Sequence, residues 1–186
     1  DGNDDEVGVC GDGVDDYVDL NGSLVDLAKN DFTLEVWIKT DTVSQDIIVK
    51  TDGDTTYKAG EKRLFVVDDG TVAFAGFGNN RISGGTAIND GEWHHIAVVW
   101  DYDSGSSGTG KLYLDGEDDT NSSAYAEYVA KNEDISTDTI KLGASVASNL
   151  FEGELDEVRI WNTARTANEI QENLDKKLDG TEDGLV

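Results

Sequence analysis

The chain has 186 residues and carries 40 Asp and Glu residues against 14 Lys and Arg residues, which gives a formal net charge of −26. This composition offers no basic patch to neutralise phosphates, and no apolar run approaches the roughly 18 residues that span a bilayer, so nucleic acid and membrane insertion are excluded. The length predicts a single domain over residues 1–186, with its core at about 7–178 and a tail or linker at 179–186.

The acidic residues are spread from Asp1 to Asp183 and alternate with strand-forming residues, which indicates a folded domain with an acidic surface. Such a surface repels itself at low ionic strength and is stabilised when salt screens its charges. The composition resembles that of proteins from extreme halophiles. The alternative source is an ordinary marine organism with an acidic, calcium-rich extracellular module.

The predicted elements are mostly strands, and the first is expected around Tyr17–Leu20. From Phe32 to Lys39 apolar and polar residues alternate, which predicts a strand with one buried face. Asp69-Gly70 predicts a hairpin between two further strands, and a Ser/Gly-rich loop at Ser104–Gly110 is expected to join the next two. Roughly nine or ten strands of about five to eight residues indicate a sandwich or a barrel.

The segment "FEGELDEVRIWN", residues 151–162, predicts the last strand. In an uninterrupted strand Asp156 shares one face with Val158 and Ile160. A carboxylate on an apolar face costs several kcal/mol unless amides, a cation or water are its partners. We therefore expect Asp156 to have such a partner.

A helix follows the last strand. Thr166 and Glu169 fit the capping box, in which the two side chains bond the free amides of a helix start. Ile170, Leu174 and Leu178 then recur every four residues and predict a narrow apolar stripe that docks on the sandwich. The cations of Lys176 and Lys177 are expected near the C-terminal end of this helix.

Five segments appear together in one order: "DGVDDYVDL", "FTLEVWIKT", "GEWHHIAVVWD", "KLYLDGE" and "FEGELDEVRIWNTARTANEI". In this order they resemble laminin-G-like (LamG-like) jelly-roll domains of the concanavalin A-like lectin/glucanase superfamily. The resemblance covers the chain from about Gly11 to Leu174. It implies an all-β fold, a two-sheet antiparallel jelly-roll sandwich with a short C-terminal helix, used for adhesion and for carbohydrate or protein binding.

The superfamily also contains glucanases, whose signature resembles E-x-D-x-E or E-x-D-x-x-E with two glutamates on one sheet face. Glu154 and Asp156 supply the first part, but Val158 or Arg159 stands in place of the second glutamate. The two histidines, His94 and His95, are adjacent on a strand and point to opposite faces, so they share no site. We expect no enzyme, and a glycoside hydrolase is only the third candidate.

The resemblance further implies calcium, because in related folds a calcium ion ties the N-terminal strand region to the C-terminal strand. By that resemblance Asp12, Asp16 and Asp156 would bind a structural Ca²⁺, with Asp15 also available. Carboxylate and carbonyl oxygens are the ligands that calcium prefers. The alternative is that backbone amides at a strand entrance bond Asp156 without a metal.

Two loops carry further ligand candidates. Asp52 and Asp54 in "TDGDTT" are expected either to hold a second calcium that bridges to a glycan or to form a solvated acidic loop. Phe77 and Arg81 in "FGNNRISGG" are suited to stack on and hydrogen-bond a ligand, unless Arg81 pairs with a surface carboxylate.

Asn21 and Asn121 begin N-x-S/T sequons in turn-like stretches, which favours an exported glycoprotein at a cell or virion surface. Cys10 is the single cysteine, so it makes no internal disulfide. It is either a small apolar residue or pairs with another chain.

The predicted function is a non-catalytic extracellular recognition or adhesion module, calcium-stabilised and adapted to high salt. Its partner is a surface glycan or a surface protein. The alternative is a building-block subunit of a virion decoration or of a cell-surface fibre of a halophile, which implies a homo-oligomer or a larger assembly.

Overall fold

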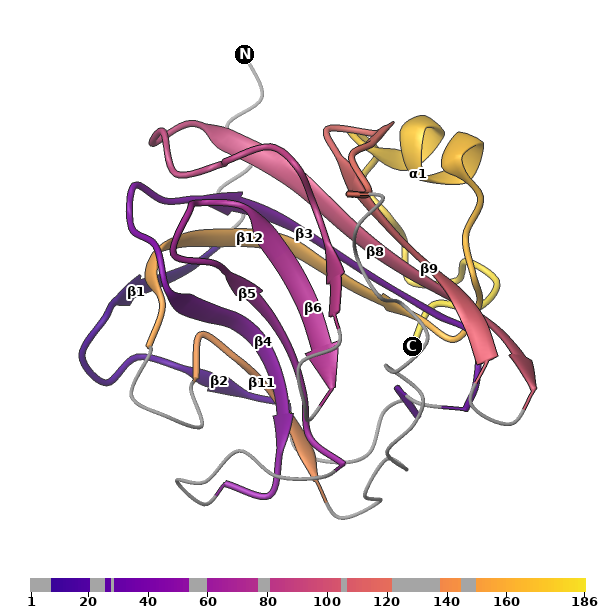
Figure 1. Cartoon of the computed structure of the whole chain (residues 1–186), viewed down its shortest axis with the longest axis horizontal. Coiled ribbons are helices and arrows are strands. Elements are labelled where there is room, and N and C mark those ends of the chain that lie inside the picture. Colours follow the sequence, from indigo (N-terminus) through magenta and orange to yellow (C-terminus); the bar gives the residue numbers. More distant parts are fainter. Residues whose placement is uncertain are drawn as a thin grey trace.

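A computed structural model describes residues 8–20, 26–27, 29–53, 60–76, 81–104, 107–121, 138–144 and 150–186. These residues form two antiparallel sheets that face one another, and one short helix lies on the side of one sheet that is turned away from the other (Figure 1). The expected two-sheet jelly-roll sandwich with a C-terminal helix is confirmed.

Each sheet has six strands within the described residues. Sheet A has the order β1-β12-β3-β8-β9-β10, with β1 (Val9–Asp12), β12 (Glu152–Trp161), β3 (Phe32–Lys39), β8 (Trp93–Ser104), β9 (Ser107–Leu114) and β10 (Glu117–Asp118). Sheet B has the order β2-β11-β4-β5-β6-β7, with β2 (Val18–Asp19), β11 (Thr139–Leu142), β4 (Gln45–Thr51), β5 (Lys62–Val66), β6 (Val72–Gly76) and β7 (Arg81–Ser83). The expected first strand is thus reduced to the two residues of β2, and β1 precedes it.

The alternation predicted for β3 is confirmed, since Leu34, Val36 and Ile38 are fully buried between the sheets. The opposite side of the same strand is buried as well at Thr33 and Glu35. The C-terminal segment covers it there, and the Thr33 hydroxyl donates to the Thr163 carbonyl at 2.8 Å. We call the side of sheet A that is turned away from sheet B its outer face.

Turn chemistry explains how neighbouring strands are joined. Asp115 (φ 50°) and Gly116 (φ 82°) form a two-residue turn with positive φ at both positions, as the right-handed twist of a tight hairpin requires. The hairpin predicted at Asp69-Gly70 joins β5 and β6, with Gly70 at φ 83°. The loop predicted at Ser104–Gly110 is too long, because β8 and β9 extend into it. Gly108 belongs to β9 and lies against Trp100, where an added Cβ would be 2.5 Å from the ring.

Helix α1 (Ala167–Asn173) begins where the capping box predicted. The Thr166 hydroxyl accepts from the Glu169 N–H, and the Glu169 carboxylate accepts from the Thr166 N–H. The helix is shorter than predicted, since it ends at Leu174 and buries only Ile170 of the expected stripe. Within the described residues, no helix has the length and apolar character needed to cross a membrane.

Residues 179–186, expected as a tail or linker, run along β12. The Val186 N–H donates to the Ile160 carbonyl at 2.9 Å, and the Asn162 N–H donates to the Gly184 carbonyl at 2.8 Å. Strand β1 occupies the first part of the same edge of β12, up to Leu155. The two ends of the described chain therefore lie along one strand.

Candidate functional site

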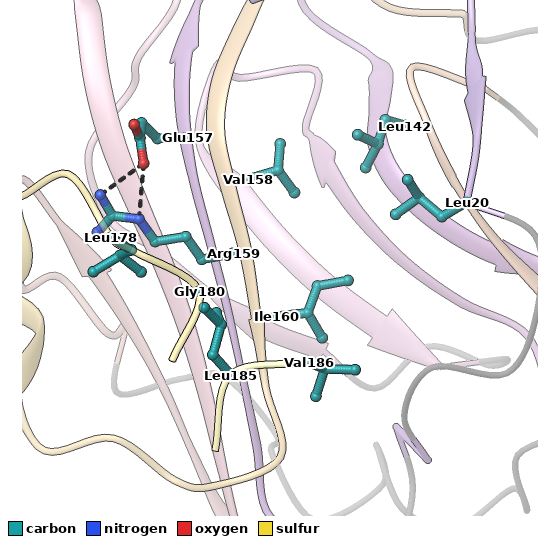
Figure 2. Close-up of a pocket in the computed structure, with 10 residues that line it drawn as sticks. All are labelled: Leu20, Leu142, Glu157, Val158, Arg159, Ile160, Leu178, Gly180, Leu185 and Val186. Atoms are coloured by element: carbon teal, nitrogen blue, oxygen red, sulfur yellow. Dashed lines mark hydrogen bonds and ion pairs between the residues drawn. The ribbon is translucent and has the colours of Figure 1, made fainter. Parts of the chain in front are cut away.

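A β-bulge in β12 changes which residues of this strand face the core. Asp156 pairs with Trp37 of β3, and the ladder is then interrupted until Arg159. Glu157 has a left-handed φ of 46° within the interruption, as one extra residue in a strand allows. Asp156 therefore lies on the outer face of sheet A, whereas Val158 points between the sheets (Figure 2). The prediction that these two residues share a face is wrong, because it assumed an uninterrupted strand.

Asp156 has a backbone partner at the bulge. Its Oδ1 accepts the N–H of Glu157 at 2.8 Å, which matches the metal-free alternative. Asp12 pairs with Glu152, four residues from Asp156 along β12. At about 3.3 Å per residue this separation is roughly 13 Å, so Asp156 is not placed with Asp12 and Asp16 as one ligand set.

The turn between β1 and β2 gathers the other predicted acids. Asp12, Asp15 and Asp16 each offer a carboxylate oxygen, and these oxygens lie within 4.8 Å of one another on exposed side chains. The Val14 N–H donates to Asp12 Oδ1 at 2.9 Å and helps to shape the turn. Val14 is 69% exposed and Tyr17 53% exposed, so two apolar surfaces flank the carboxylates. We call residues 12–17 the acidic turn.

The donor set of the acidic turn fits calcium. Calcium takes six to eight oxygen ligands at about 2.3–2.6 Å, so two ligands on opposite sides of one ion are about 5 Å apart. The 4.8 Å limit on the three carboxylate oxygens is compatible with that arrangement. Because the side chains are exposed, water or a ligand hydroxyl has access to the remaining positions.

Glu35 is the centre of a buried charge network on the outer face of sheet A. Its side chain has no exposed surface, and His95 Nε2 lies 3.3 Å from Oε2. The guanidinium nitrogens of Arg159 and Arg165 lie 3.8 Å and 3.6 Å from the same carboxylate. A buried carboxylate without cations this close would be strongly destabilising. This network was not expected from the sequence, because alternation along β3 places Glu35 on an ordinary polar face.

Arg159 joins this network to the C-terminal segment. Its guanidinium donates to the carbonyls of Asn173 and Lys176, both at 2.7 Å, and to Glu157 Oε2 at 2.9 Å. The carbonyls at a helix end carry partial negative charge, so a cation is favourable there. The sequence assigned this role to Lys176 and Lys177, but α1 ends before them and has no basic residue in its last turn.

His94 bridges two loops at one end of the sandwich. Its Nδ1 lies 3.0 Å from Asp115 Oδ2, and its Nε2 lies 3.2 Å from Asp90 Oδ1. Partial burial lowers the pKa of His94, but the hydrogen bonds with Asp115 and Asp90 outweigh it, so the pKa is raised above its ordinary value. Because carboxylates only accept, both bonds form fully when the imidazole is protonated at both nitrogens.

A cavity of about 470 Å³ lies between β12 and the residues that follow α1 (Figure 2). Arg159 and Glu157 are bonded to each other on its lining. The remaining lining is aliphatic apart from one glycine: Leu20, Leu142, Val158, Ile160, Leu178, Gly180, Leu185 and Val186. This lining offers van der Waals contacts rather than the hydrogen bonds that a polyhydroxylated ligand needs.

The remaining predicted residues do not gather at one place. Arg81 is exposed at the start of β7, Asp52 is exposed after β4, and Asn121 is exposed with its N–H donating to the Ser83 carbonyl at 2.8 Å. The other three candidates lie outside the described residues: Phe77, Asp54 and Asn21.

The four tryptophans differ in how much of their side chains is exposed. Trp100 and Trp161 are fully buried, so neither is a surface for a sugar. Trp37 is half-buried, and Trp93 is 39% exposed.

Cys10 is exposed on β1 and is not packed as a small apolar residue.

The acids of β12 have separate partners. Glu154 Oε1 lies 3.2 Å from Lys39 Nζ, and Glu157 Oε2 lies 2.9 Å from Arg159 Nη2. Glycoside hydrolysis instead requires two carboxyl groups that face each other across the scissile bond. Each of these two glutamates is paired with a cation.

Known proteins resemble the chain in sequence and in fold. The sushi, von Willebrand factor type A, EGF and pentraxin domain-containing protein 1 of Rattus norvegicus is 31% identical over 107 residues, which covers 56% of this chain and 3% of that protein. This chain therefore spans only a small part of the curated relatives it matches.

Two solved structures share the architecture. A putative carbohydrate binding protein from Bacteroides ovatus ATCC 8483 superposes with a TM-score of 0.67 at 22% identity, over 91% of this chain and 47% of that one. Domain 4 of AbnA, a GH43 extracellular arabinanase from Geobacillus stearothermophilus in complex with arabinotriose, gives 0.60 at 17% identity, over 89% and 75%. At these identities the likeness shows the fold alone.

The family assignment agrees with the five segments found in the sequence. The Laminin_G_3 family model, described as Concanavalin A-like lectin/glucanases superfamily, matches residues 12–171. This match covers most of the chain and includes the acidic turn, every strand from β2 to β12 and the start of α1. The chain therefore belongs to the Laminin_G_3 family of the concanavalin A-like lectin/glucanase superfamily.

Proposed function

We propose that this domain is a non-catalytic recognition module, displayed outside the cell, that binds a surface glycan or a surface protein through the acidic turn. The observation that carries the proposal is the close group of Asp12, Asp15 and Asp16 beside the exposed side chains of Val14 and Tyr17. Such a group would combine ligands for a cation with apolar contact surface on one short turn. Support also comes from the superfamily and from the arabinotriose bound by the arabinanase domain.

Calcium is the cation that we propose for this turn. Two unit charges within 4.8 Å of one another repel by roughly 1 kcal/mol in water, and the surrounding net charge of −26 adds to this repulsion. A divalent cation would relieve it and would leave coordination positions open to a hydroxyl of the ligand. Tyr17 would then offer an aromatic surface beside the bound hydroxyl.

Calorimetric titration with calcium chloride, at one fixed high salt concentration, tests the cation. We expect binding by the wild-type chain and by Asp68→Asn, which removes an exposed acid at the β5–β6 turn. The Asp12→Asn, Asp16→Asn double variant should lose the binding and the rise in melting temperature that calcium produces. Equal titrations of the double variant and the control would contradict the calcium part of the proposal.

Binding of ligand is measured separately, with arabinotriose and a panel of cell-surface polysaccharides in calcium and again in EGTA. We expect calcium to strengthen the binding of at least one ligand of the panel, and Tyr17→Ala to weaken this calcium-dependent part of the binding. If calcium makes no difference to any ligand of the panel, the acidic turn is not the recognition site.

The building-block alternative stays a prediction, and light scattering at the same salt would test it, because an assembly subunit should give a mass well above 20.1 kDa.

A further inference from the structure

We propose that the uncovered part of the outer face of sheet A is a second binding site, for a neutral saccharide, in which the indoles of Trp37 and Trp93 are the stacking surfaces. The proposal shares with the proposed function only the class of ligand. In sheet A, β12 and β3 separate β8, which carries Trp93, from β1, which leads into the acidic turn. Calcium has no part in it.

The strand register places both indoles on one face. Lys39 pairs with Trp93, and Trp37 pairs with His95, so the two tryptophans are diagonal neighbours on adjacent strands. Diagonal neighbours are about 7–8 Å apart, within reach of one ligand for side chains of this size. Because His95 and Trp37 lie on the outer face, Trp93, two residues from His95, lies there too.

Trp37 is held in a fixed orientation. Its Nε1 donates to the Leu174 carbonyl at 3.3 Å, and its ring meets the buried His95 ring edge-on with centroids 5.4 Å apart. Residues 174–177 form a wall beside it, and together with Glu157 and Arg159 they line a cavity of about 270 Å³ on the side of Trp37. A ring whose rotation is already restricted loses little conformational freedom when a ligand stacks on it.

Hydrogen-bonding groups surround the two indoles. The Lys39–Glu154 ion pair lies beside Trp93, and these two side chains are 39% and 46% exposed. Asp156 is the register partner of Trp37, and its carboxylate has acceptor capacity beyond the bond to the Glu157 amide. Flat apolar surfaces next to exposed donors and acceptors match a sugar ring, which has an apolar face and a rim of hydroxyls.

The charge of the chain selects among ligands. A net charge of −26 repels polyanions over the range of the Debye length, and a neutral saccharide experiences no such repulsion. The aliphatic cavity at the end of β12 has no aromatic residue on its lining and is less suited to a sugar. The ligand is therefore a neutral saccharide, and its site is the Trp37–Trp93 surface.

The test is affinity electrophoresis of the full chain through gels that contain arabinan, xylan or a mixed-linkage β-glucan, with EGTA present throughout. We expect at least one of these neutral polysaccharides to retard the chain. Trp93→Ala should weaken that retardation by about tenfold or more in affinity, which corresponds to about 1.4 kcal/mol or more. Trp93→Tyr should restore part of it. The matched control is Val186→Ala, which trims another exposed apolar side chain and should bind as the wild type does.

Tryptophan fluorescence gives a second measurement. Trp93 is exposed, Trp37 is half-buried, and Trp100 and Trp161 are buried, so saccharide should shift the emission of the wild-type chain. The shift should be smaller for Trp93→Tyr, which keeps only the Trp37 indole at the site. The proposal is overturned if no polysaccharide retards the chain, or if Trp93→Ala binds like the wild type. Binding that appears only with calcium overturns it too, while the proposed function stands. Binding in EGTA that depends on Trp93 supports it, whatever the acidic turn does.

Discussion

Replacing Arg159 with methionine tests the buried charge network on the outer face of sheet A. Methionine keeps much of the apolar stem and removes the guanidinium. The change deletes the donors to the carbonyls of Asn173 and Lys176 and the cation 3.8 Å from Glu35. The carboxylate of Glu35 would remain buried with fewer charges to balance it.

The expected loss follows from burial. Removing one member of a buried ion pair costs about 3–5 kcal/mol, because the charge left behind stays desolvated. The side chains of Arg159 and Glu35 are 4% and 0% exposed, so water gives little relief. Domains are stable by about 5–15 kcal/mol, so this loss is a large share of the total. The matched control is Lys39→Met, whose pair with Glu154 is 39% and 46% exposed and should be worth about 0–1 kcal/mol.

Urea unfolding at one fixed salt concentration measures both variants, with free energies compared from midpoints at a common slope. Hydrogen exchange adds the location of the effect. Protection should fall most over residues 167–177, because Arg159 bonds the end of α1 and the chain just after it. If Arg159→Met is no more destabilising than Lys39→Met, the network does not hold the C-terminal segment and our reasoning fails.

Three further changes follow from single features of the structure. The pKa of His94 is raised in the folded protein, so protonated His94 stabilises the fold. This contribution is fully present below the unfolded-state pKa of about 6.5 and is lost as pH rises through the folded-state pKa. The melting temperature should therefore fall as pH rises through these two pKa values, and His94→Gln should make the fall smaller. Gly153→Ala drives a Cβ into the Lys39 carbonyl and should lower the melting temperature far more than Gly91→Ala, where φ is positive but the space around the new Cβ is open. Equal shifts of the two variants would contradict this. Val158→Asp should destabilise the domain strongly, because the bulge points this residue between the sheets, and a mild effect in urea unfolding would mean that the bulge is absent.

Much of the fold was predictable because several local signals agreed with one another. The alternation over Phe32–Lys39 and the turn signal at Asp69-Gly70 each fix a strand or hairpin by short-range sterics. The capping box at Thr166 fixes a helix start in the same way. Such signals depend on neighbours in sequence, so they can be recognised without any knowledge of the tertiary structure.

The position of Asp156 was not predictable by simple alternation, because one extra residue inverts the faces of the strand beyond it. A signal was present in the sequence all the same. Leu155 and Val158 are both apolar but have opposite parity, and both pack against the core between the sheets. Two apolar residues three apart in a strand that continues with alternation indicate a bulge between them.

The charge network around Glu35 could not be predicted from the sequence for a different reason. Glu35 is distant in sequence from Arg159 and Arg165, and it meets them only because β12 pairs with β3 and the C-terminal segment folds over both. Each of them alone is an ordinary polar residue of an acidic chain. Their mutual dependence exists only in the tertiary structure.

Salt should act differently on the exposed acids of the domain and on its buried charge network. The chain has 14 Lys and Arg residues, and two of them are placed around one buried carboxylate, so the surface is left with fewer cations among its acids. Repulsion among exposed acids is screened by salt, whereas a buried ion pair is screened much less. Salt should therefore stabilise wild type and Arg159→Met by similar amounts, and the difference between them should stay nearly constant. A difference that closes as salt rises would place the Arg159 contacts at the surface and would remove the basis for the large loss expected above.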